Sequence, residues 1–218
     1  MKTDSQLKKD VQDELNFQPN IKETEIGVAV KEGVVTLTGF VESYAQKLAA
    51  ERAAEGVSGV RAVAENLKVK LQHSFQRSDT EIASAAINAL KWNVEVPDTR
   101  IKLRVEDGFV TMEGDVDWQF QKNSAYESVR HLLGVQGVRN VIAVRQPKAS
   151  ALEVSQKIQD AFKRSATIDS QKVSVEAFEG RVVLKGTVRS WAERQDAERA
   201  AYATPGVTIV DDLIAVGV

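Results

Sequence analysis

The sequence predicts an α+β fold built from three tandem small modules, each a three-stranded sheet packed by two helices in the order α-β-β-α-β. Three observations predict it: a glycine-valine segment occurs three times at nearly equal intervals, a helix-start signal precedes each copy, and the hydrophobic period changes from helical to alternating within each copy. The expected modules cover residues 1–72, 73–147 and 148–218.

The repeat is clearest in its glycines, which keep the same register in all three copies. They are Gly33, Gly39, Gly59, Gly108, Gly114, Gly134, Gly180, Gly186 and Gly206. The first of each set follows an acidic residue between two alternating segments, which predicts a hairpin turn, because glycine accepts a positive φ without strain. The second lies inside a strand, where it is expected to mark a bulge or a close approach by a packed helix. A phosphate loop is disfavoured, since such loops lie between a strand and a helix.

The helices are expected where capping signals recur. Capping boxes at Thr3, Ser78 and Ser150 each have glutamine or glutamate three residues later, and apolar residues then follow at helical spacing. A second helix is expected after Ser43 and Ser190. In the second copy, Trp118 takes the place of the serine, so Asp117 is the expected cap.

The strands are expected from alternation of apolar and polar residues. Segments 26–30, 101–105 and 173–177 form the first strand of each module, the glycine segments form the second, and apolar pairs ending at Val69, Val144 and Val216 form the third. The linkers near 72–77 and 146–149 are short, so neighbouring modules are expected to touch.

Composition excludes several functions. The 218 residues carry a net charge of −2 and no cysteine, which argues against a nucleic-acid partner and excludes disulfides and thiol chemistry. The two histidines, His73 and His131, have no recurring partner pattern, so neither a metal nor another cofactor is expected, and no nucleophile has a visible base beside it. We therefore expect a protein that is not an enzyme. The first residues lack a leader pattern, so a cytoplasmic location is expected, or a periplasmic one if a leader was removed.

The order of elements and the G-x-V-x-L-x-G-x-V pattern resemble the BON domain, a bacterial family named for osmotically inducible and nodulation proteins. In the first copy the pattern comprises Gly33, Val35, Leu37, Gly39 and Val41, with Gly59-Val60 further on. The other copies depart from it only slightly, at Met112, Trp118 and Arg181. A three-copy form without a leader is similar to cytoplasmic triple-BON proteins. The resemblance implies a non-catalytic module that serves in osmotic or envelope stress and attaches to phospholipid.

Aromatic and basic residues recur at the start of each second helix and form the candidate lipid or partner surface. They are Tyr44, Lys47, Trp118, Phe120, Lys122, Trp191 and Arg194. Amphipathic aromatics beside bases suit an anionic headgroup layer, but packing of these aromatics against the core or between modules is the more common arrangement, because aromatic side chains are often buried. The favoured function is peripheral attachment to anionic phospholipid, which for a cytoplasmic protein means the inner membrane. The alternative is a scaffold that binds other proteins or itself without contacting lipid.

Overall fold

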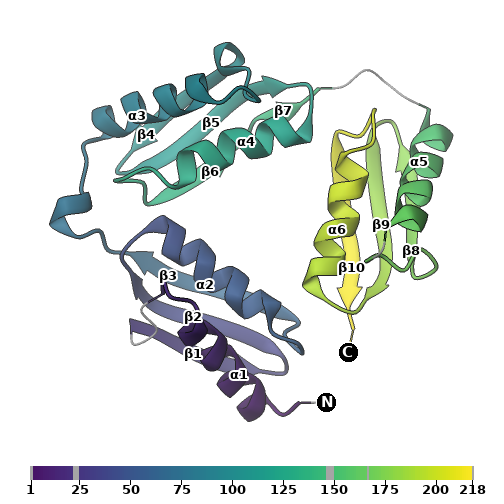
Figure 1. Cartoon of the computed structure of the whole chain (residues 1–218), viewed down its shortest axis with the longest axis horizontal. Coiled ribbons are helices and arrows are strands. Elements are labelled where there is room, and N and C mark those ends of the chain that lie inside the picture. The colour runs from purple at the N-terminus through teal and green to yellow at the C-terminus, as the bar shows by residue number, and fades with distance from the viewer. Residues whose placement is uncertain (1, 22–24, 146–149, 166, 218) are drawn as a thin grey trace. The chain divides into compact units, whose positions relative to one another are not determined.

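The computed structural model describes residues 2–21, 25–145, 150–165 and 167–217 (Figure 1). Their α-carbon contacts divide the chain into two compact units: residues 2–113 with 125–141, and residues 114–124 with 142–217. The strands form three separate sheets, one for each predicted module, which confirms the α+β fold class.

The first module has the predicted order of elements. These are α1 (Asp4–Phe17), β1 (Ile26–Lys31), β2 (Val34–Val41), α2 (Tyr44–Gly56) and β3 (Ala62–Val69). The sheet order is β1-β2-β3, with β1 antiparallel and β3 parallel to the central β2. A parallel third strand requires a crossover, and α2 provides it.

Both helices of the first module cover the same face of its sheet (Figure 1). The core joins Leu7, Val11 and Leu15 of α1 to Val35 and Leu37 of β2, and all five side chains are almost fully buried. From α2 it receives only alanines, at positions 50, 53 and 54. These small side chains let α2 lie close to the strands.

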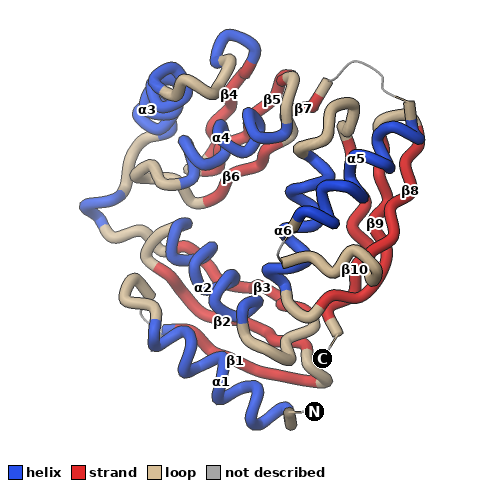
Figure 2. Tube along the Cα trace, turned by 45° about the vertical axis from the view of Figure 1, so that its right-hand side comes forward, coloured by secondary structure: helices blue, strands red, loops and turns tan. Residues whose placement is uncertain are grey.

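The third module repeats this architecture. Its elements are α5 (Ala151–Arg164), β8 (Val173–Phe178), β9 (Arg181–Val188), α6 (Trp191–Tyr202) and β10 (Ile209–Val216). The sheet order is β10-β9-β8, again with one antiparallel and one parallel neighbour of the central strand. Figure 2 shows both helices on one side of this sheet, and their side chains share one core with it.

The second module differs in its third strand. It contains α3 (Asp79–Trp92), β4 (Ile101–Glu106), β5 (Phe109–Val116) and α4 (Gln119–Arg130), with short 3₁₀ turns at 73–75 and 98–100. The third strand is divided into β6 (Gly137–Asn140) and β7 (Ala143–Val144), both parallel to β5. The expectation of one continuous strand ending at Val144 is therefore wrong. The register is the same on both sides of the interruption, so the strand is broken without a slip.

Each hairpin turn has two successive residues in the left-handed region. Glu32 and Gly33 have φ values of 52° and 78°, and the turns at Asp107-Gly108 and Glu179-Gly180 repeat this pattern. Two positive φ angles define the type I′ turn, whose twist matches that of the flanking strands. The predicted turn role of these glycines is confirmed.

The glycine inside the second strand is required by a close backbone approach. Gly39 has a φ of 117°, and a Cβ atom there would overlap the carbonyl oxygen of Glu25, at the entry to β1. Gly186 is placed in the same way against the carbonyl oxygen of Lys172, before β8. The neighbour is thus the backbone entering the first strand and not a helix, which corrects the expected reason for this glycine.

The first residue of α1 and of α3 ties the helix to the hairpin turn. The Asp4 carboxylate accepts the backbone N–H groups of Glu32 and Gly33, at 2.8 and 3.2 Å. Asp79 accepts those of Asp107 and Gly108, both at 2.9 Å. The third module has Ala151 at this position, which carries no acceptor.

Substitution of Gly39 by alanine should destabilise the first module by about 2 kcal/mol, because the new methyl group meets a carbonyl oxygen and the backbone angle is unfavourable for it. Gly56→Ala in α2 is the matched control, since nothing lies within 4 Å of its Cβ position. Chemical denaturation of the full chain measures both. Equal stability of the two variants would contradict the role given to Gly39.

Introduction of the missing carboxylate should stabilise the third module. Ala151→Asp is expected to add about 1 kcal/mol, because it supplies an acceptor to two turn N–H groups and a negative charge to the first turn of α5. In chemical denaturation of the full chain, the midpoint of the transition that reports unfolding of the third module should rise. Ala151→Asn, which is neutral, should give a smaller gain.

Candidate functional site

The predicted aromatic residues lie at the start of the second helix of each module. Tyr44 and Trp191 are the first residues of α2 and α6, and Trp118 immediately precedes α4. Phe120 is half exposed, at 51%, while the other three are partly buried. The Tyr44 hydroxyl lies 2.9 Å from that of Tyr126, so this side chain contacts α4 within the compact unit that holds both residues.

Two of the three recurring bases, Lys47 and Arg194, are engaged inside their own modules. The Lys47 ammonium lies 2.9 Å from Glu65 Oε2 and donates to the Leu67 carbonyl oxygen at 2.9 Å. The Arg194 Nε lies 2.6 Å from Asp212 Oδ2, and its guanidinium stacks 5.0 Å from the Trp191 ring centre. Partial burial lowers the pKa of Lys122. Because each carboxylate cancels the charge of its base, Lys47 and Arg194 attract an outside anion only weakly.

The second helices share one capping arrangement. The amide oxygens of Gln46 and Gln121 accept the N–H of Glu42 and of Asp117, at 2.8 and 3.0 Å. Gln121 also accepts the N–H of Trp118. The predicted serine caps are present at Ser43 and Ser190. In α4, Gln121 serves the residues that precede the helix, while the expected cap by Asp117, whose carboxylate would accept N–H groups of the first helical turn, stays a prediction.

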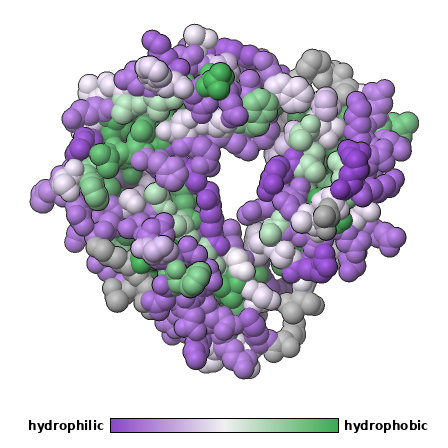
Figure 3. All heavy atoms as spheres, in the orientation of Figure 1, coloured by the Kyte–Doolittle hydropathy of each residue, from purple (hydrophilic) through white to green (hydrophobic). Residues whose placement is uncertain are grey.

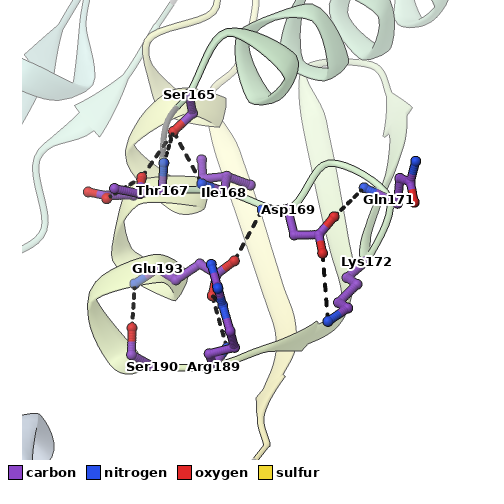
Figure 4. A network of polar contacts seen from close by, with 10 residues as sticks. Ser165, Thr167, Ile168, Asp169, Gln171, Lys172, Arg189, Ser190 and Glu193 are labelled. Atoms are coloured by element: carbon purple, nitrogen blue, oxygen red, sulfur yellow. Dashed lines mark hydrogen bonds and ion pairs between the residues drawn. The ribbon is translucent and has the colours of Figure 1, made fainter.

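In the third module the equivalent residue is a buried carboxylate, Glu193, only 5% exposed (Figure 4). One oxygen accepts the N–H of Arg189 at 2.9 Å, and the other accepts the N–H of Asp169 at 3.1 Å. Burial opposes the charge, but these backbone N–H groups and the Arg189 guanidinium hold the pKa of Glu193 below its ordinary value. The carboxylate thereby fastens the segment before β8 to the start of α6.

A surface that the sequence interpretation missed is the face of the first sheet opposite its helices. Its outward residues are mostly small: Gly27, Ala29, Thr36, Thr38, Ala62 and Ala64. Lys31 and Lys68 are exposed on this face, and the Lys70 ammonium lies 5.9 Å from the ring centre of Phe40, which is 49% exposed. No aspartate or glutamate is among the outward residues of these three strands. Alternation along the strands was the signal that could have found it.

The corresponding face of the third sheet is neutralised. Lys185 pairs with Glu176 at 2.8 Å, and Arg181 pairs with Asp211 at 3.0 Å. Lys31 and Lys68 form no such pair among the described residues. Hydrophilic residues cover most of the visible side of each module, with apolar ones interspersed (Figure 3). Charge therefore distinguishes the open face of the first sheet from that of the third.

Among the residues that the structure describes, no group of three or more histidine, aspartate or glutamate side chains is arranged to hold a metal ion. None of the described helices has both the length and the apolar character that crossing a bilayer requires.

Repeated α-β-β-α-β modules define a class of tandem small-domain proteins, and comparison identifies the family. The BON domain matches residues 3–70, 78–146 and 150–218, and the chain belongs to this family. Osmotically-inducible protein Y of Escherichia coli K12 is 36% identical over 141 residues, which are 63% of this chain and 70% of that protein.

Two solved structures of CdsD, a structural protein of the type III secretion system of Chlamydia trachomatis, were also matched. One is 15% identical with a TM-score of 0.28, covering 97% of this chain and 92% of that one. The other, of the C-terminal domain, is 15% identical with a TM-score of 0.27 and covers 96% of each. Scores this low carry no argument about function.

The Glu193 carboxylate should make the third module sensitive to acid. Its lowered pKa means that its stabilisation is present above the ordinary value of 4.5 and is lost as the pH falls through the lower folded value. Glu193→Gln should lose stability at neutral pH but show a flatter dependence on acid, because glutamine cannot be protonated in this range. Thermal unfolding from about pH 7 to pH 3 tests this. Parallel curves for the two proteins would contradict it.

Proposed function

We propose that this chain is a non-catalytic BON protein that attaches peripherally to anionic phospholipid during osmotic or envelope stress. Its similarity to an osmotically inducible protein supports the link to stress. The observation that carries the lipid part is the open face of the first sheet, which bears exposed lysines and has no aspartate or glutamate at the outward positions of its three strands.

The geometry of this face suits contact with a flat anionic layer. Its outward side chains are short apart from Phe40 and the lysines, so the strands can approach a surface closely. Each basic residue near an anionic membrane contributes about 1 kcal/mol, so Lys31, Lys68 and Lys70 together contribute roughly 3 kcal/mol. Phe40 adds an apolar group at the headgroup level. Such binding is weak and reversible, as peripheral attachment requires.

The starts of the second helices suit this role less well. Lys47 and Arg194 are each 25% exposed and already face a carboxylate. The expected lipid surface at these helices therefore remains the second candidate. Contact with lipid at this surface, unlike contact at the first sheet, should shift the native tryptophan emission.

Co-sedimentation with phosphatidylglycerol-containing vesicles should detect binding, and purely phosphatidylcholine vesicles should not bind. Binding should weaken as salt is raised, because exposed charges are screened within about 10 Å at 0.1 M. Lys31→Gln with Lys68→Gln should weaken it about 30-fold, from a loss of roughly 2 kcal/mol. The matched control is Arg181→Gln with Lys185→Gln, which removes the same charge from the third sheet, where both bases are paired.

Three results would contradict the proposal. Equal losses in the two double variants would mean that overall charge, and not the first sheet, governs binding. A blue shift of native tryptophan emission on anionic vesicles, with no effect of the lysine changes, would place the contact at the second helices. Absence of all binding at low salt would favour the scaffold function. A Phe40→Trp variant should itself shift to the blue if the first sheet is the contact surface.

A further inference from the structure

We propose that the ion pairs Lys47–Glu65 and Arg194–Asp212 close the free edges of β3 and β10 against pairing with a second copy of the chain. Each strand ends the order of its sheet and is eight residues long. An edge strand of that length presents a row of backbone N–H and C=O groups that can pair with another chain. These two edges therefore need protection that a central strand does not.

In the first module the pair occupies both backbone groups of Leu67, in the middle of β3. The N–H of Leu67 donates to Glu65 Oε1, and its carbonyl oxygen accepts from the Lys47 ammonium at 2.9 Å. The same ammonium lies 2.9 Å from Glu65 Oε2. This ion pair holds the two side chains together against the backbone of Leu67. An incoming strand would have to displace both side chains before it could bond to Leu67.

The third module protects β10 with different atoms at equivalent positions. The N–H of Ile214, the counterpart of Leu67, donates to Asp212 Oδ1 at 2.9 Å. The Arg194 guanidinium holds the Asp212 carboxylate through Nε and donates from Nη2 to the Asp212 carbonyl oxygen at 3.3 Å. The Tyr202 hydroxyl accepts the N–H of Val210 further along the same strand, at 3.4 Å.

The second module supports this interpretation by contrast. At the position of Glu65 and Asp212 it has the neutral Asn140, and its third strand is the one divided into pieces of four and two residues. A short, interrupted edge is itself a poor template for pairing. The acid–base pair thus occurs in the two modules whose edge is long and continuous.

A second copy is the occupant that best fits an opened β10. The same strand from two chains can pair antiparallel about a twofold axis, so one edge supplies both sides of the interface. Ile209 and Leu213 of β10 are 48% and 62% exposed, and a continued sheet would bring them beside the same strand of the other copy. Backbone pairing would then be accompanied by burial of apolar area.

The test replaces the pair in the full chain by apolar residues of similar bulk, Arg194→Met with Asp212→Val. The control, Lys185→Met with Glu176→Val, removes an ion pair on the open face of the same sheet that contacts no edge backbone group. Sedimentation velocity over a range of concentrations should show at least tenfold stronger self-association of the first variant than of the wild type or the control. Equal association of both variants would attribute the effect to added hydrophobicity and overturn the proposal.

Amide hydrogen exchange identifies the surface involved. In the Arg194→Met, Asp212→Val variant, the Ile214 amide should exchange rapidly when dilute and slowly when concentrated, while Leu184 in β9 stays protected throughout. Loss of Leu184 protection would indicate that the double variant unfolds. In that case the single variant Asp212→Val replaces it, because the Arg194 side chain is 25% exposed and can remain hydrated without its partner. Monomeric behaviour of a folded variant with an unprotected Ile214 would overturn the proposal.

Discussion

A three-stranded sheet in so small a module can bury only one of its faces, and its second face and two edges are left at the surface. Two helices cover the buried face, and the alanines of the second helix set how closely it lies on the strands. The features that differ between the modules lie on the uncovered face and the edges of the sheet. The open face and the free edge of the third strand must each be made compatible with water, and the modules achieve this differently.

The open faces of the first and third sheets diverge although their cores are alike. In the third module, Lys185 and Arg181 each pair with an acid on a neighbouring strand, so the face is neutral. In the first module, short side chains predominate, and Lys31 and Lys68 have no acidic neighbour on the face. A repeat that keeps its core constant can therefore assign different surfaces to different copies. The proposed lipid contact belongs to one module and does not require three aligned binding faces.

Much of the fold was predictable because its signals are local. Capping boxes at Thr3 and Ser78 are present as expected, and the acid-glycine turns adopt the expected left-handed angles. The candidate site was less predictable. Lys47 and Arg194 were recognised as recurring, but recurrence alone cannot distinguish a base that faces solvent from one that supports a strand edge.

The sequence by itself determined the repeat, the order of elements and the turn types, because helix caps and glycine conformations depend on residues a few positions apart. Only the tertiary structure decided what the charges do. Lys47 meets Glu65 because a parallel crossover brings the third strand beneath the second helix, and Gly39 is required because the chain entering β1 passes against it. Both depend on strand register and helix placement, which arise from packing of the whole module and leave no local signal in the sequence.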